Sequence, residues 1–273
     1  MSTPIIILAG AAGTGKDTVA DILCRKHGAV AIAQADPMKR LAAKVFDFSA
    51  DQLWGPSQNR NAADNRFTGE IRAFNTAADK LQQCGLPWVV SLLPGVDRDT
   101  HLDAFWHLKK WMTNLSRHHL QEQKPLTPRY TLQTLGTEWG RLFSKNIWVD
   151  YTLRQALTLL GGGHSYNREL GTTIDDQTPL PAFVVVTDGR FPNEIITIKG
   201  AGGMAMRLVS SDLSASAQQA GVVGHASETS LGGIPEGWFD ITLSNDKALG
   251  LAALETKLET FSEGIPGLGV KIK

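Results

Sequence analysis

The chain has 273 residues, of which 42% are hydrophobic and 20% charged, and its 27 Lys and Arg balance its 27 Asp and Glu. This composition excludes an acidic disordered tail, and neutrality argues against a broadly basic surface for nucleic acid. No glycine triplet repeat or sustained heptad is present, so collagen and coiled-coil structures are excluded as well. The length fits one large domain, or one domain with an elaboration.

The sequence contains two cysteines, Cys24 and Cys84. This number fits a reducing compartment, where we expect both to be small buried apolar groups. The apolar run near the N-terminus has no basic segment before it and no cleavage site after it, so no signal peptide is predicted. No stretch approaches the length of a membrane span. We therefore expect a cytoplasmic protein.

The first part of the chain reads as alternating strands and helices. Pro4–Ala9 is a short apolar run, which predicts a strand buried on both faces. A glycine-rich turn follows, and apolar spacing predicts a helix over Asp17–His27. Ala29–Gln34 is a second predicted strand. Asp36 then begins a helix as its capping residue, with Pro37 at the first helical position.

The middle of the chain, 47–128, has a less regular pattern. Pro and Gly punctuate Leu86–Gly95, where we expect a break, and apolar spacing predicts a helix over His101–Gln123. Six of the seven Trp lie between Trp54 and Trp148. Because aromatic side chains dominate core burial, we expect them to pack an added helical lobe.

The last part of the chain returns to regular alternation. Arg129–Phe143 and Asn146–Leu160 are predicted helices, and Gly161–Pro181 reads as a polar linker. Further strands are predicted at Phe183–Thr187, Met204–Val209 and Phe239–Ser244, helices at Pro192–Lys199 and Asp246–Phe261, and a loop at 210–237. Alternation of this kind predicts an α/β fold with helices on both faces of a parallel sheet.

The strongest local motif lies between the first strand and the first helix. Gly10, Gly15 and Lys16 have the Walker A spacing of a phosphate-binding loop (P-loop). Glycines let backbone N–H groups turn toward phosphate oxygens, the helix N-terminus adds partial positive charge, and the lysine reaches the terminal phosphates. Asp17 occupies the usual Ser/Thr position and Thr18 follows. A carboxylate there can hold Mg²⁺ directly or through water.

A second motif follows the strand at Phe183–Thr187. Asp188 stands at its carboxyl end, where open α/β sheets bind ligands, and Arg190 could reach an anion at the same edge. The alternatives are a helix-capping role for Asp188 and a surface ion pair for Arg190.

Several motifs, in one order along the chain, resemble deoxynucleoside monophosphate kinases of tailed bacteriophages. They are Gly15-Lys16-Asp17-Thr18 with Ala20-Asp21, Asp36-Pro37-Met38-Lys39, Arg129 to Glu138, Trp148-Val149, Asp188 to Glu194 and His225-Ala-Ser-Glu228. The resemblance covers most of the chain except about Phe67–Thr127. It implies one P-loop, adenylate-kinase-like domain over residues 1–273, a three-layer parallel sheet with a helical substrate-binding lobe at 47–128 and a short lid loop at 210–237.

The same resemblance implies a role for individual residues. The ATP site would comprise Gly13, Gly15, Lys16, Asp17 and Thr18, with Asp17 as the Mg²⁺ ligand. The acceptor site would comprise Arg66, Arg129, Gly136, Thr137, Trp148, Asp188, Arg190 and Glu194, and the lid would carry His225 and Glu228. Lys16, Arg190 and Asp188 would serve the chemistry. Packing is the alternative for Trp148, and a solvated helix charge is the alternative for Glu194.

Two further expectations concern charged and titratable groups. Some members of the resembled family carry a basic residue inside the P-loop, where this chain has Ala12 and Thr14, or at the end of the fourth strand, where it has Ser210. Arg207 or Lys199 would then supply the missing charge. His118 and His119, on the predicted helix, are expected to face solvent, because two ligands are too few for a metal site.

The predicted function is ATP-dependent phosphorylation of deoxynucleoside monophosphates, with Mg²⁺. The partners would be ATP and the acceptor nucleotide, without a nucleic acid polymer or a membrane; a homodimer is compatible with the sequence, and a phage-encoded chain would act in the host cytoplasm. Two alternatives stay open: a kinase of another phosphorylated acceptor, such as dephospho-coenzyme A or phosphomevalonate, and a P-loop ATPase or switch.

Overall fold

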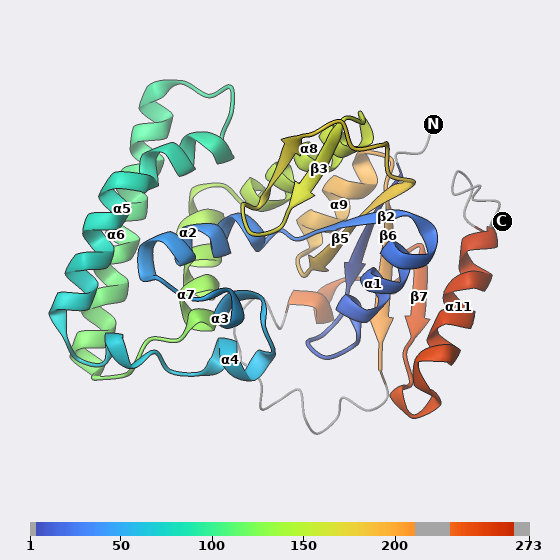
Figure 1. Ribbon diagram of the computed structural model, residues 1–273, viewed down its shortest axis with the longest axis horizontal. Coiled ribbons are helices and arrows are strands. Elements are labelled where there is room, and N and C mark those ends of the chain that lie inside the picture. The colour runs from blue at the N-terminus through green and yellow to red at the C-terminus, as the bar shows by residue number, and fades with distance from the viewer. Residues whose placement is uncertain (1–3, 211–229, 265–273) are drawn as a thin grey trace. The chain divides into compact units, whose positions relative to one another are not determined.

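Five apolar strands form a parallel sheet in the order β2-β5-β1-β6-β7 (Figure 1). The strands are β1 Ile5–Ala9, β2 Ala29–Ile32, β5 Phe183–Gly189, β6 Met204–Val209 and β7 Ile241–Ser244. Strand β1 is buried along its whole length, as a central strand with both faces covered requires. The predicted α/β fold class with a parallel sheet is confirmed.

Helices cover both faces of this sheet. One face packs against α1 (Lys16–His27) and α11 (Gly250–Gly264), which share a buried apolar cluster with it. Helix α9 (Pro192–Gly200) packs on β1 and β6. The α1 connection runs from β1 to β2 and the α9 connection runs the other way along the sheet, from β5 to β6. Right-handed crossovers therefore place these two helices on opposite faces.

The structure, a computed structural model, describes residues 4–210 and 230–264. The chain divides into two compact units. The first contains the sheet and comprises residues 1–34, 152–168 and 172–273, and the second comprises residues 35–151 and 169–171. The predicted helical lobe, 47–128, falls within the second unit. Within the described ranges, no helix combines the length and the apolar character needed to cross a membrane.

The second unit is built from helices. They are α2 Asp36–Phe46, α3 Ala50–Trp54, α4 Ser57–Asn61, the 3-10 turn η1 Asn65–Phe67, α5 Ile71–Leu92, α6 Arg98–Glu122, α7 Pro128–Thr134 and the π-helical turn η2 Leu135–Arg141. The start of α8 (Ile147–Leu160) also belongs to this unit, and its residues from 152 on belong to the first unit. Helices α5 and α6 pack side by side, and three indoles cluster in the core, with Trp139 5.0 Å from Trp88 and 5.8 Å from Trp148 between ring centroids. The expectation that Trp residues pack a helical lobe is confirmed for these three and for the buried Trp111, and it is wrong for Trp106, which is exposed on α6.

The break expected over Leu86–Gly95 is wrong for its first part, because α5 continues through Pro87 to Leu92. Proline in a helix interior removes a hydrogen bond and costs about 3 kcal/mol. Pro87 is exposed, whereas the neighbouring Trp88, Val89 and Leu92 are buried in the core. Burial of these side chains offsets the local cost, and this tertiary contribution is invisible in the local pattern.

The polar linker expected over Gly161–Pro181 is also wrong in part. Strands β3 (His164–Asn167) and β4 (Thr172–Asp175) form an antiparallel hairpin. Gln155 of α8 anchors it, because its Oε1 accepts the backbone N–H of Thr173 at 2.7 Å. Both strands are polar and only half-buried, so no apolar alternation marks them in the sequence.

The remaining described segments are short helical turns. They are η5 Ser230–Gly233, η6 Glu236–Trp238 and η7 Lys247–Leu249. Most of the predicted lid at 210–237, including His225 and Glu228, lies outside the described residues.

The packing of the second unit predicts that Gly140→Ala is destabilising. A Cβ at Gly140 would lie 2.3 Å from Cζ2 of the buried Trp148 ring, so the ring must move and the free energy of unfolding should fall by about 1–3 kcal/mol. Urea denaturation followed by Trp fluorescence measures the change. Gly200→Ala, at a helical glycine with open space around it, is the control and should be neutral. Equal stability of the two variants would contradict the described packing.

Candidate functional site

The turn from β1 into α1 leaves no room for side chains. A Cβ at Gly10 would lie 2.6 Å from the Leu208 carbonyl oxygen of β6 and 2.8 Å from Thr14 Oγ1. Gly15 has a φ of +92°, in the left-handed region that side chains disfavour. The glycines predicted from the Walker A spacing are therefore required at these places by the backbone itself.

Lys16 is the first residue of α1 and bends back over the loop. Its Nζ donates hydrogen bonds to the carbonyl oxygens of Gly10 and Ala11, both at 2.8 Å. Thr14 is buried and closes the turn, because its Oγ1 donates to the Ala11 carbonyl at 2.9 Å. The ammonium thus lies at the loop together with the positive end of the α1 dipole, an arrangement suited to phosphate.

Asp17 and Thr18 follow in the first turn of α1, and both are exposed. In residues 4–210 and 230–264, no three His, Cys, Asp or Glu side chains gather as a metal site would require. Mg²⁺ in nucleotide enzymes usually takes one or two carboxylates, several waters and the substrate phosphates rather than a protein cage. An exposed carboxylate one residue after Lys16 fits that kind of binding.

Asp188 lies next to the P-loop in the sheet. Strand β5 pairs with β1, with Ala9 opposite Gly189, so Asp188 and the start of the loop share the carboxyl edge of neighbouring strands. Asp188 is half-buried and its Oδ1 accepts the backbone N–H of Gln34 at 2.9 Å. Gln34 follows β2, the other neighbour of β5, so this carboxylate links two strand ends at the ligand-binding edge.

Glu194 shapes the turn that carries Arg190. Its carboxylate is buried, and its Oε2 accepts the backbone N–H groups of Arg190 at 2.6 Å and Phe191 at 3.0 Å. A solvated helix charge, the alternative interpretation, is therefore wrong for Glu194. The acidic residue two positions after Pro192 is a sequence signal of such a helix N-terminus.

Lys199 does not lie at the carboxyl edge of the sheet, where the glycine loop lies. Its Nζ pairs with Asp240 Oδ1 at 2.8 Å, and Asp240 Oδ2 accepts the backbone N–H of Ala205. Asp240 precedes β7 and Ala205 is the second residue of β6, so this ion pair lies at the amino edge of the parallel sheet. The expectation that Lys199 supplies charge to the loop is wrong, because helix α9 carries its C-terminal end to the opposite edge. Arg207 lies within β6, 3.6 Å from Glu236 and over the Phe239 ring.

In the second unit, three of the predicted acceptor residues occupy one continuous helical stretch. Arg129 is the second residue of α7 and is half-buried. Gly136 and Thr137 belong to the π-helical turn η2, where Thr137 Oγ1 donates to the Gln133 carbonyl at 2.7 Å. π-Helical turns are rare and occur frequently at functional sites. The predicted helix over Arg129–Phe143 thus changes its hydrogen-bond pattern within the motif.

Trp148 lies in the core beneath this π-helical turn. The side chain is buried, and its Nε1 donates to the Gly136 carbonyl at 2.9 Å. The ring leaves no room for a side chain at Gly140. This packing favours the core interpretation, and contact of Trp148 with a nucleotide stays a prediction.

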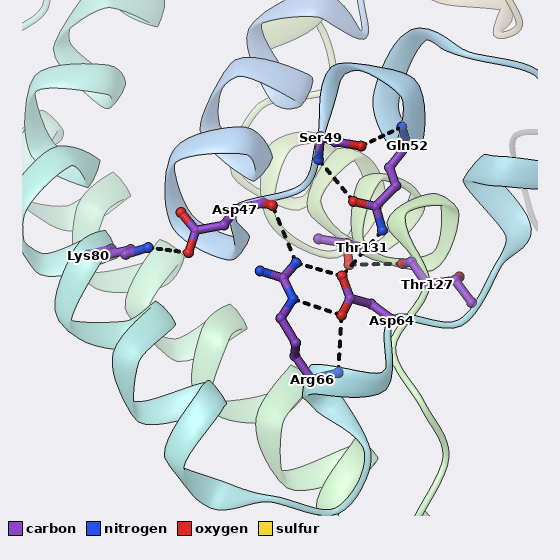
Figure 2. Close-up of polar contacts among 8 residues, drawn as sticks. All are labelled: Asp47, Ser49, Gln52, Asp64, Arg66, Lys80, Thr127 and Thr131. Carbon is purple, nitrogen blue, oxygen red and sulfur yellow. Dashed lines mark hydrogen bonds and ion pairs between the residues drawn. The ribbon is translucent and has the colours of Figure 1, made fainter.

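Arg66 is held by a carboxylate (Figure 2). Its Nε and a terminal nitrogen donate to the two oxygens of Asp64 at 2.9 and 2.6 Å, and the same terminal nitrogen donates to the Asp47 carbonyl at 3.3 Å. The Arg66 side chain is about half exposed, whereas that of Asp64 is buried. Arg66 therefore joins η1 to the end of α2, and its role as a substrate arginine stays a prediction.

Asp64 collects contacts from three segments. Besides Arg66, it accepts the side-chain amide of Gln52, at the end of a capping box formed with Ser49, and its backbone N–H donates to the Leu126 carbonyl at 2.8 Å. The hydrogen bond from Arg66 lowers the pKa of the Asp64 carboxyl. Figure 2 shows the side chains of Arg66 and Gln52 converging on the Asp64 carboxylate.

The expectation that both histidines face solvent is confirmed for His118 and wrong for His119. His119 is 3% exposed, its Nδ1 lies 2.8 Å from the Lys124 carbonyl, and its ring stacks on Phe74. Burial lowers the pKa of His119. The reason is helical geometry, which turns neighbouring residues by 100° so that only one of them faces the core.

The first unit therefore brings several predicted residues to one edge of its sheet. They are Gly13, Gly15, Lys16, Asp17, Thr18, Asp188, Arg190 and Glu194. The second unit carries Arg66, Arg129, Gly136, Thr137 and Trp148. Sequence reasoning overlooked Asn245, which lies beside the loop; its position directly after the last strand was the available signal.

Comparison with known proteins gives distant homology to a nucleotide kinase. The chain is 28% identical over 116 residues to a protein of Acanthamoeba polyphaga mimivirus described as "Putative deoxynucleotide monophosphate kinase". The alignment covers 40% of this chain and 58% of that protein. No model of a protein family matches the chain.

The Asp64 cluster predicts a pH-dependent contribution to stability. Asp64→Asn should lower the free energy of unfolding by about 1–2 kcal/mol at pH 7, since it weakens charge-assisted bonds to a half-exposed arginine. Because the pKa of Asp64 is lower in the folded chain, the unfolded state binds a proton first as the pH falls. The stabilisation is therefore present above about pH 4 and is lost at lower pH.

Urea titrations at several pH values measure this difference. The control is Asp103→Asn, at an exposed carboxylate that lies 3.7 Å from His107, and it should change stability by less than about 0.5 kcal/mol. A wild-type advantage over Asp64→Asn that grows below pH 4 would contradict the account.

Proposed function

We propose that this chain is an ATP-dependent kinase that phosphorylates deoxynucleoside monophosphates to diphosphates. The observation that carries the proposal is the glycine loop with Lys16 at the carboxyl end of β1, beside Asp188 on the paired strand β5. The distant homology to a mimivirus protein described as "Putative deoxynucleotide monophosphate kinase" supports the acceptor class.

The chemistry requires positioning and positive charge rather than a strong base. A phosphate monoester has a second pKa near 6, so at about pH 7 the acceptor is largely a dianion and is already nucleophilic. Lys16 would neutralise the transferring phosphoryl group while the loop N–H groups hold the donor phosphates. Two observations support this assignment: the close backbone contacts at Gly10 and Gly15, and the hydrogen bond from the Lys16 ammonium to the Gly10 carbonyl.

Arginines would hold the acceptor phosphate, because a guanidinium grips two oxygens at once. Arg190 is the candidate in the first unit, since Glu194 fixes the backbone of its turn at the carboxyl edge of the sheet. In the second unit we assign Arg129, Gly136, Thr137 and Arg66 to the acceptor nucleotide, and the π-helical turn at Gly136 supports that assignment.

Asp17 and Asp188 are the residues that would hold Mg²⁺ together with the phosphates of ATP. The ion would neutralise charge on the phosphate oxygens as the phosphoryl group moves. Asp188 also keeps the end of β2 in place through the Gln34 N–H, so its substitution should affect both binding and folding.

A coupled ADP-release screen over the common ribo- and deoxyribonucleoside monophosphates tests the proposal. We expect ADP formation that depends on a deoxynucleoside monophosphate. Lys16→Ala should lower kcat by at least about a hundredfold, because no ammonium would then neutralise the negative charge of the phosphoryl group in the transition state. Steady ATP hydrolysis without an acceptor would instead indicate a P-loop ATPase. Turnover with another phosphorylated acceptor alone would contradict the deoxynucleotide assignment.

Arg190→Ala tests the acceptor assignment separately. We expect the acceptor KM to rise by at least about tenfold, or kcat to fall by as much, because a bidentate phosphate contact is lost. The affinity for ATP should stay within about twofold of wild type. Arg25→Ala, at an exposed arginine of α1 paired with Asp21, is the matched control and should behave as wild type. Wild-type kinetics of Arg190→Ala would refute this role.

A further inference from the structure

We propose that Asn245 is a positioning residue of the P-loop, which orients the Thr14–Gly15 peptide so that its N–H faces the phosphates of the bound nucleotide. This inference rests on the proposed function and assigns a residue to its donor-nucleotide site. The sequence around Asn245 carries no P-loop motif, and the assignment comes from contacts within the first unit.

Asn245 reaches the loop from the end of the edge strand β7, two strands away from β1. It follows β7 directly, and its backbone N–H donates to the Val209 carbonyl of β6 at 2.8 Å. The side chain is 7% exposed, and its Nδ2 donates to the Thr14 carbonyl at 3.0 Å. Strand β6 separates β7 from β1, so this bond connects the loop after β1 to the end of the last strand.

The bond fixes the direction of a peptide plane. A trans peptide holds its C=O and N–H antiparallel, and the described chain contains no cis peptide bonds. With the Thr14 carbonyl directed at Asn245, the Gly15 N–H must point away from it. Gly15 is the N-cap of α1 and stands one residue before Lys16, among the N–H groups that a Walker A loop turns toward phosphate.

The same side chain explains the glycine at this position. A Cβ at Gly15 would lie 2.3 Å from Asn245 Nδ2, so the amide fills the space that a side chain would need. A buried amide donor without its acceptor would also be costly, and this cost opposes rotation of the peptide. The contact between Asn245 and Gly15 therefore holds the loop in the conformation that a polyphosphate would need, before the polyphosphate binds.

Substitution of Asn245 should weaken binding of the donor nucleotide selectively. Asn245→Ala removes the bond and should raise the Kd for Mg-ATP by about three- to tenfold, the range of a typical hydrogen bond. Asn245→Asp keeps the size but turns a carboxylate oxygen toward the Thr14 carbonyl and adds negative charge beside the phosphates. Its Kd should rise by more than about tenfold.

The measurements are calorimetric titration with Mg-ATP and steady-state kinetics on the full chain. We expect a higher KM for ATP, an unchanged KM for the deoxynucleoside monophosphate and, for Asn245→Ala without nucleotide, a Tm close to that of the control. The control is Asp246→Ala, because Asp246 caps η7 through the Ala248 N–H but has no described contact with the loop.

The outcomes separate this inference from the proposed function. Wild-type affinity for ATP in Asn245→Asp overturns the inference even where the chain phosphorylates deoxynucleotides. Equal loss in Asp246→Ala overturns it as well, because the effect would then come from the strand end. Selective loss of ATP affinity in a chain that phosphorylates no deoxynucleotide supports the inference and refutes the proposed acceptor. A wild-type chain that does not bind ATP overturns both.

Discussion

The structure depends on a steric constraint at the turn between the first strand and the first helix. The backbone there passes within contact of the ends of two other strands, at the Leu208 carbonyl of β6 and the Asn245 amide after β7. Neither contact leaves room for a Cβ at Gly10 or Gly15. The loop conformation therefore depends on the assembled sheet, and the loop forms only when strands far apart in the sequence have paired.

Electrical neutrality of the chain is compatible with a local cationic site. Many cations pair with carboxylates of the same chain, as Lys199 does with Asp240, Arg66 with Asp64 and Lys39 with Asp36. Lys16 donates to two backbone carbonyls at the start of a helix. The distribution of charge therefore matters more than its sum, since a binding pocket needs cations only where phosphates would lie.

The sequence predicts those elements that are determined by the residues within them. The apolar run at Pro4–Ala9 and the glycine spacing at Gly10–Lys16 specify β1 and the loop, because burial on both faces and backbone close approach restrict the residue types. The hairpin at 164–175, the continuation of α5 through Pro87 and the burial of His119 depend on partners elsewhere in the chain. The Asp64–Arg66 pair shows the same limit, since nothing in Arg66 itself distinguishes an arginine that holds a loop from one that holds a substrate.

Under the proposed function, the Gly15 N–H of the β1–α1 loop donates to a nucleotide phosphate. Two-dimensional ¹H–¹⁵N NMR of the full chain, titrated with Mg-ADP and separately with adenosine, tests it at that atom. We predict a downfield shift of the Gly15 amide proton with Mg-ADP and little change with adenosine, which has no phosphate. A Gly15 amide that does not move while Mg-ADP saturates the protein would contradict the account.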